Sequence, residues 1–129
     1  MKTMTIEEFR TAVHAQDVPR EHYAFRCPMC KTVQTSTDLI KAGAGATVDE
    51  VQVFLGFSCV GRFTGAGSPS KATPGQGCDW TLGGLFRMHE LEVITEDGAH
   101  HAHFEPATPE EAQSHYAAFL ARSPSETDL

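Results

Sequence analysis

Apolar residues recur at helical spacing near the start of the chain, at Ile6, Phe9 and Val13. Residues three or four positions apart share one face of a helix, so these side chains are expected to face the core. Thr5 precedes the run and Glu8 follows three residues later, which is the capping-box pattern of a helix N-terminus. Val18-Pro19 ends the periodicity. The pattern therefore predicts an N-terminal helix within residues 1–19.

A second helical pattern closes the chain. It begins with Thr108 as N-cap, Pro109 at the first helical position and Glu111 completing a capping box. An apolar stripe follows at Ala112, Tyr116, Phe119 and Leu120. Because proline disfavours continuation of a helix, Ser123-Pro124 is expected to end it. We predict a C-terminal helix over residues 107–123.

Between the two helical patterns, short runs show the composition of strands. Residues 23–26 and 31–35 are rich in β-forming side chains and predict a hairpin around the turn that joins them. Apolar residues then alternate with others from Val51 to Phe57, which predicts a strand with one buried face. Residues 37–42 resemble a short capped helix that ends at a glycine.

A further hairpin is predicted before the last helix. Residues 91–94 and 101–104 flank the turn sequence Glu96-Asp97-Gly98, and Asp-Gly between two such runs is a strong hairpin signal. The elements together predict an α+β fold, in which a small antiparallel sheet is flanked by the two terminal helices. A chain of 129 residues without repeats or linkers most simply forms one domain, here residues 1–129 with a core over 20–106.

Four cysteines stand in the centre of this pattern, at Cys27, Cys30, Cys59 and Cys78. The first two have the CxxC spacing of a metal knuckle, in which two thiolates hold one ion. A structural zinc site needs four tetrahedral ligands, and the chain supplies four with none left over. We therefore predict one structural Zn²⁺ per chain, in a site that resembles a zinc ribbon.

The cellular compartment of the protein bears on this prediction, because it decides whether the thiols stay reduced. The chain has no apolar run long enough to span a membrane, and its first residues lack the apolar core of a signal peptide. We expect a cytoplasmic protein without membrane contact, in which reduced thiols bind metal rather than form disulfides. A redox dithiol at the CxxC sequence is less favoured, because a β-rich stretch follows it and two cysteines would have no role.

Charge is distributed unevenly along the chain, whose net charge is −7. Residues 20–87 carry a net charge of +2, whereas residues 88–129 carry −8 and are expected to repel nucleic acid and to face a basic partner. Three cations lie beside the cysteines in sequence, at Arg26, Lys31 and Arg62. We interpret them mainly as compensation for the negative charge of a zinc–thiolate centre.

Two further groups of residues suggest binding. Arg62 and Trp80, each close to a cysteine, are candidates for a ligand-binding surface that stacks a base or nucleotide, although packing of Trp80 in the core is favoured. His100, His101 and His103 follow the second hairpin turn, but two histidines on one strand face bind metal weakly, so we favour a single metal site.

Three sequence blocks surround the cysteines. They are Cys27-Pro28-Met29-Cys30, Phe57-Ser58-Cys59-Val60-Gly61-Arg62 and the segment from Gly77 to Phe86. As a set they resemble a small uncharacterised family found in bacteria, phages and prophages. The resemblance implies the four-cysteine site and a phage or prophage setting in a bacterial cell, and it supplies no catalytic residue. Zinc ribbons often have two CxxC pairs, whereas 18 residues separate Cys59 from Cys78 here.

These observations lead to two hypotheses of function. The first is a non-catalytic zinc-binding protein, phage- or prophage-encoded, that binds a host protein. The second is a binder of nucleic acid or nucleotide through the basic region beside the zinc site. An enzyme is less favoured, because the chain offers no identifiable pair of nucleophile and base, and the fourth cysteine closes the position that a catalytic metal keeps open.

Overall fold

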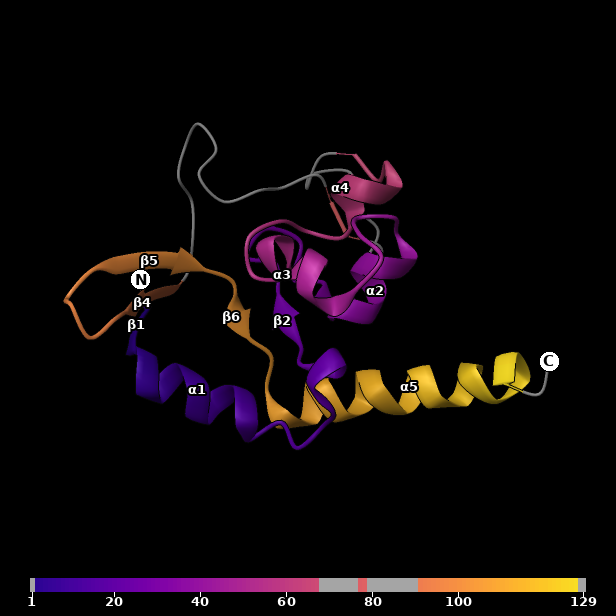
Figure 1. The fold of residues 1–129 in the computed structure, drawn as a ribbon, viewed down its shortest axis with the longest axis horizontal. Coiled ribbons are helices and arrows are strands. Elements are labelled where there is room, and N and C mark those ends of the chain that lie inside the picture. The colour runs from indigo at the N-terminus through magenta and orange to yellow at the C-terminus, as the bar shows by residue number, and fades with distance from the viewer. Residues whose placement is uncertain (1, 68–76, 79–90, 128–129) are drawn as a thin grey trace.

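The computed structural model describes residues 2–67, 77–78 and 91–127 (Figure 1). The chain forms helices together with small sheets whose pairings are mostly antiparallel, so the predicted α+β class is confirmed. The elements are β1 (Lys2–Thr5), α1 (Ile6–His14), the 3-10 helix η1 (Arg20–His22), β2 (Phe25–Arg26), β3 (Val33–Gln34), α2 (Ser36–Lys41), α3 (Val48–Leu55), α4 (Gly61–Thr64), β4 (Leu91–Ile94), β5 (His100–His103), β6 (Glu105–Pro106) and α5 (Pro109–Thr127).

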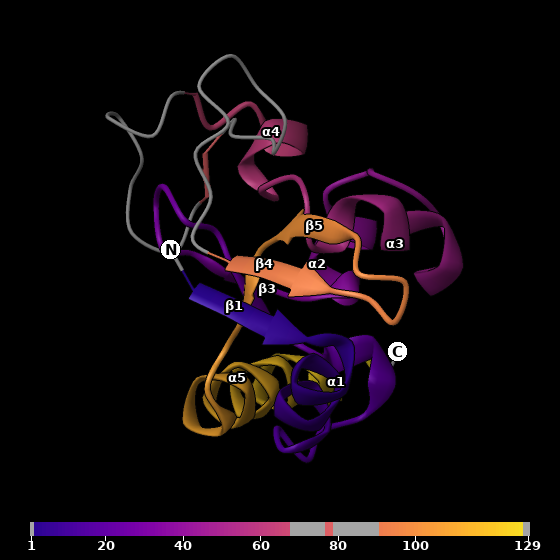
Figure 2. The ribbon, with the colours of Figure 1, turned by 90° about the vertical axis from the view of Figure 1, so that its left-hand side faces the viewer.

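Two small sheets form the β part of the fold. In the first, β2 pairs antiparallel with both β3 and β6; in the second, β4 lies between β1 and β5. Both predicted hairpins are confirmed, with Phe25 opposite Gln34 and Leu91 opposite His103. Strand β1 was not predicted. It pairs parallel with β4, from a position almost ninety residues earlier in the chain, as Figure 2 shows.

The predicted strand from Val51 to Phe57 is wrong, because this segment forms helix α3. The Thr47 hydroxyl caps the helix by accepting from the Glu50 N–H at 3.2 Å. Val51 and Leu55, four residues apart, are buried, whereas Val53 is 65% exposed. A strand would have placed all three on one face. The burial therefore follows the helical period, although β-branched residues fit either structure.

The two terminal helices begin where the sequence predicts and end elsewhere. Both capping boxes are present, with Thr5 and Glu8 in α1 and Thr108 and Glu111 in α5. Helix α1 ends at His14, before the proline predicted to stop it. Helix α5 remains helical past Ser123-Pro124 to Thr127, so the predicted end was wrong. Proline in a helix interior removes one backbone hydrogen bond and clashes with the carbonyl four residues earlier, so the local sequence favours an end here and does not explain why α5 continues.

Two other predicted boundaries also need correction. Helix α2 begins at Ser36, and its cap is Thr35, two residues before the predicted start at Thr37. Residues 61–64, for which the sequence pattern predicts no helix or strand, form α4. In α5, Ala112 is buried as expected, whereas Leu120 is 45% exposed.

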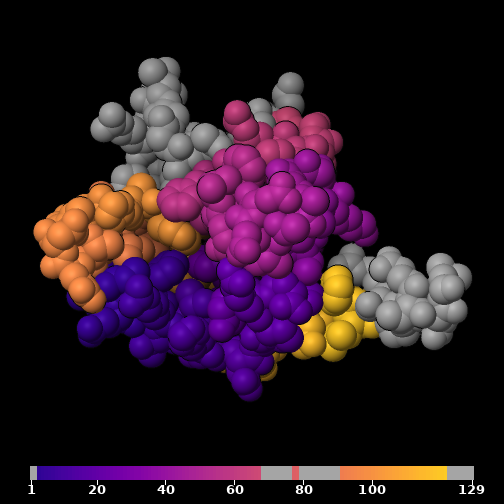
Figure 3. Space-filling model, in the orientation of Figure 1, coloured from indigo at the N-terminus to yellow at the C-terminus, as the bar shows by residue number. Residues whose placement is uncertain are grey.

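The main core surrounds the cysteines. Its buried members are Val13, Phe25, Cys27, Leu39, Val51, Leu55, Cys59, Cys78 and Phe104. Figure 3 shows α1, α2 and α3 packed together, with the β4–β5 hairpin on one side and α5 emerging on the other. Among the helices that the structure describes, none is long and apolar enough to cross a bilayer.

A buried glutamine joins the terminal helices to the first sheet. Gln16 follows α1 and has no exposed surface. Its side-chain nitrogen donates to the carbonyls of Ala24 and Ala107, at 2.9 and 3.1 Å, and its side-chain oxygen accepts from the Ala24 N–H at 2.8 Å. The backbone carbonyl of Gln16 accepts from the side chain of Gln113 in α5. Satisfying all these groups in the interior holds α1, β2 and α5 in one arrangement.

Candidate metal centre

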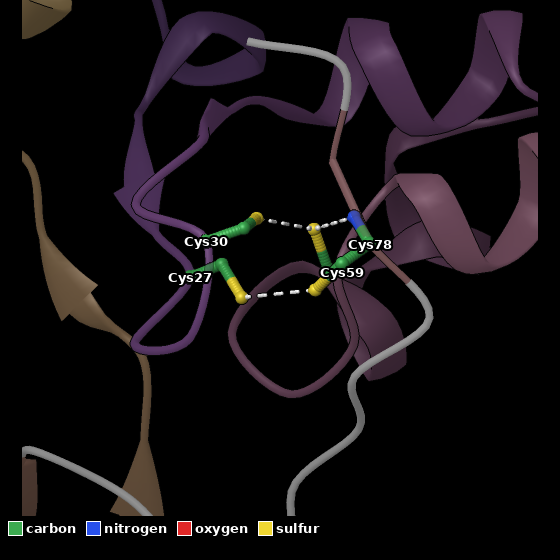
Figure 4. Close-up of side chains that lie close together, drawn as sticks. All are labelled: Cys27, Cys30, Cys59 and Cys78. Carbon is green, nitrogen blue, oxygen red and sulfur yellow. Dashed lines mark hydrogen bonds between the residues drawn. The ribbon is translucent and has the colours of Figure 1, made fainter. Parts of the chain in front are cut away.

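The four cysteines meet at one point, although they come from three parts of the chain (Figure 4). Their Sγ atoms all lie within 4.8 Å of one another, with 3.8 Å between Cys27 and Cys78 and 3.7 Å between Cys30 and Cys59. These separations are too long for disulfides, and all four cysteines are free. They match the roughly 3.8 Å between sulfurs placed tetrahedrally 2.3 Å from one ion. The cluster can therefore hold a metal ion.

Cys27 and Cys30 are positioned by the turn of the β2–β3 hairpin. The Cys27 N–H donates to the Thr32 carbonyl at 3.0 Å, and the Lys31 N–H donates back to the Cys27 carbonyl at 2.9 Å. Lys31 adopts the left-handed conformation, with φ of 63°, and so turns the chain back toward β3. No helix begins at the CxxC sequence, so the turn has the form of a metal knuckle rather than that of a helix-initiating redox dithiol.

Cys59 is positioned by a second buried glutamine, which the sequence analysis did not single out. Gln34 on β3 has no exposed surface. Its amide nitrogen donates to the Leu55 and Ser58 carbonyls at 2.9 and 2.8 Å, and its oxygen accepts from the Val60 N–H at 2.7 Å. The side chain thus fastens the turn after α3 onto the hairpin that carries the first two cysteines. A glutamine in a β-rich run carries no local signal of this role.

Cys78 is brought in by a close crossing of two glycines. A Cβ atom on Gly61 would lie 2.3 Å from the Cys78 nitrogen, and one on Gly77 would lie 2.6 Å from the Gly61 nitrogen. Gly77 also has φ of +83°. The Gly77 N–H donates to the Thr32 hydroxyl at 3.1 Å, which ties the returning chain to the hairpin. Only glycine at both positions allows the returning chain to pass this close.

Backbone N–H groups surround the sulfurs and favour charge on them. The pKa of Cys59 is lowered to about 5 by its hydrogen bond with the Cys27 side chain, and further by N–H groups of Gly61 and Cys78. The pKa of Cys27 is raised above its usual range, first by the same hydrogen bond and then by burial. This hydrogen bond therefore favours the negative charge on Cys59 and the proton on Cys27. A bound cation would favour the thiolate at both.

The other candidate residues lie apart from this cluster. Arg62 is exposed on α4, three residues after Cys59. Trp80 lies outside the described residues. The three histidines of β5 do not converge: His100 pairs with Glu92 at 3.0 Å, whereas His103 donates from Nδ1 to the Phe104 carbonyl at 2.7 Å. In the described part of the chain, the four cysteines are the one group of three or more ligand side chains able to hold a metal.

Comparison with known proteins places this site in a family. A search of curated proteins and a search of solved structures found no match. A family model does match, from the N-cap of α1 to the residue before the N-cap of α5, and the matched segment contains all four cysteines. Since residues 5–107 match the model described as VVA0879-like, the chain belongs to the VVA0879-like family.

Proposed function

We propose that the chain is a non-catalytic zinc-binding protein, in which one Zn²⁺ on Cys27, Cys30, Cys59 and Cys78 organises a binding domain. The observation that carries the proposal is the set of four sulfurs within 4.8 Å of one another. Four thiolates in tetrahedral arrangement favour zinc among the common metals, with iron as the main competitor. Because all four ligand positions are filled by protein, the metal would act in structure rather than as a catalyst.

The proposed partner is a protein of the host, and the proposed setting is the cytoplasm of a bacterium that carries a phage or prophage. Three observations support this. The four free cysteines fit a reducing compartment, and three of them are fully buried. The sequence blocks around them resemble proteins of bacteria and phages. Residues 88–129, with a net charge of −8, would favour a partner with a basic surface.

A second candidate function is binding of nucleic acid or nucleotide beside the metal. One observation favours it: Lys31 and Arg62, which follow Cys30 by one residue and Cys59 by three, are both exposed. Binding to mixed oligonucleotides that weakens steeply with salt, and that Arg62→Gln reduces, would support this candidate over the first.

The experiment that tests the metal is elemental analysis of protein purified under reducing conditions. The proposal expects about one zinc per chain, and reduced zinc content in Cys59→Ser and Cys78→Ser variants. Iron at the same stoichiometry would show a metal site of a different kind. Absence of metal, together with two disulfides in freshly reduced protein, would contradict the proposal. Affinity capture from host lysate with the zinc-loaded protein then tests for a protein partner.

A further inference from the structure

A cavity of about 400 Å³ lies between α1, η1, α3 and the end of β5. Aromatic rings of Phe9, Tyr23 and Phe25 form much of its wall, and Leu55 and Gly56 border it from α3. None of the lining residues is a cysteine, so the cavity is separate from the metal centre. Its volume falls within the range of small-molecule sites, which are typically apolar with a few polar groups.

His103 gives this cavity a rigid and uncharged side. Its Nδ1–H donates to the Phe104 carbonyl at 2.7 Å. Its ring meets Phe9, Phe25 and Phe57 edge-to-face, with centroids 4.7, 5.3 and 4.9 Å away. Burial lowers the pKa of His103, so the neutral imidazole persists at neutral pH. The ring lies so close to Gly56 that a Cβ there would be 2.2 Å from Nε2.

The charged side chains along the cavity, those of Arg10 and Arg20, are both basic. Arg10, His14 and Arg20 line it, and among the described residues that border it none is Asp or Glu. Arg20 pairs with Asp49 at 3.1 Å, but both side chains are largely exposed and such pairs are weak. Arg10 forms no ion pair with a described carboxylate; Glu96 and Asp97 share a separate depression with it. This basic rim stands out in a chain with a net charge of −7.

We propose that this cavity binds a small planar aromatic molecule that carries an anionic group. The ring of the ligand would pack against the wall that Phe9, Phe25 and His103 form together, since edge-to-face and offset arrangements of rings are favourable. Its anion would pair with Arg10 and Arg20 at the rim, where charge-assisted hydrogen bonds are the strong ones. The proposal does not depend on the metal or on a protein partner.

Two dyes that differ in charge provide the test, with the full-length metal-loaded protein. The first is 1-anilinonaphthalene-8-sulfonate, an aromatic anion; the second is N-phenyl-1-naphthylamine, which lacks the sulfonate. We expect Arg10→Gln/Arg20→Gln to weaken binding of the anionic dye at least about tenfold, because two charge-assisted contacts are lost. The neutral dye should change by less than about twofold. Lys41→Gln, which removes an exposed charge on α2 away from the cavity, is the matched control.

A second variant should move affinity in the opposite direction. Asp49→Asn removes the carboxylate that competes for Arg20, so the anionic dye should bind about two- to threefold more tightly. In NMR spectra, the dye should shift the amide signals of Gln52 and Gly56 more than those around the cysteines. Unchanged binding of the anionic dye in the double variant would overturn the proposal. An equal loss of affinity for both dyes, or NMR shifts confined to another surface, would also overturn it.

Discussion

Gly61 and Gly77 touch backbone to backbone, and this contact delivers the fourth cysteine to the metal centre. A Cβ on Gly77 would lie 2.6 Å from the Gly61 nitrogen, and one on Gly61 would collide with Cys78 itself. The Cys78 N–H then donates to Cys59 Sγ at 3.2 Å. Cys59 and Cys78, the second pair of ligands, are therefore held together by close backbone packing rather than by a short CxxC turn.

The glycine crossing leads to the first prediction. Gly61→Ala should displace residues 77–78, lower zinc affinity and destabilise the protein by about 1–3 kcal/mol, as expected for overpacking. Gly65→Ala is the control, because nothing lies within 4 Å of a Cβ there, although its φ of +75° adds local strain. Competition with a chromophoric chelator measures the affinity. Equal zinc affinity in the two variants would show that the crossing is dispensable.

Gln34 leads to the second prediction. Gln34→Ala removes the hydrogen bonds that its side chain makes to the Val60 N–H and to the carbonyls of Leu55 and Ser58. We expect a loss of about 3 kcal/mol in the free energy of unfolding, because buried polar groups become unsatisfied. We also expect faster zinc release, since the turn that carries Cys59 loosens. Gln113→Ala, which removes one partly buried hydrogen bond, should cost about 1 kcal/mol or less. Denaturant unfolding of the zinc-loaded proteins distinguishes these outcomes.

The third prediction concerns metal removal. The ligands join a hairpin, the turn after α3 and the returning chain at Cys78, so zinc would hold together segments far apart in sequence. Cys78→Ser should therefore destabilise the protein by more than about 4 kcal/mol, a loss as large as those that follow removal of a metal or disulfide. His101→Ala, at an exposed position, should change stability little.

Chelation of the parent protein offers an independent check of the same idea. Calorimetry with and without a chelator should show a large fall in melting temperature for the parent and almost none for Cys78→Ser. His103 is unsuitable as a control, because its ring packs against three phenylalanines. If parent and Cys78→Ser melt together, the metal does not organise this fold.

The fourth prediction concerns pH. His22 is 3% exposed, packs against Tyr116 and Phe119 of α5, and has a buried Nδ1 without a partner. Burial lowers its pKa in the folded state below the ordinary value of 6.5. The unfolded chain therefore binds a proton first as pH falls. Stability should be complete above about pH 6.5 and should decline below it.

A substitution isolates the contribution of His22 from that of the thiols, which also take up protons in acid. His22→Phe keeps an aromatic ring against α5 and removes the titrating group. Between about pH 7 and 5.5, the free energy of unfolding should fall less steeply in His22→Phe than in the parent. Parallel curves for the two proteins would show that His22 has the same pKa in the folded and unfolded states.

Features whose causes lie within a few residues of one another could be predicted from the amino-acid sequence. The capping boxes at Thr5 and Thr108 were predictable because the cap and its partner are three positions apart. The two hairpins were predictable because their turns lie in the local sequence. The four cysteines could be assigned to one site because thiol chemistry and their number left few alternatives.

Features that depend on residues far apart in the sequence were set by packing in the folded protein. Residues 48–55 have side chains suited to strand or helix, and packing of Val51 and Leu55 into the core selected the helix. Strand β1 exists because β4 lies beside it. Contacts between distant segments also produce three other features. These are the hydrogen bonds of Gln34, the crossing of Gly61 and Gly77, and the basic rim of the cavity. Such contacts leave no periodic signal in the sequence, because each depends on how segments that are distant in the chain pack against one another.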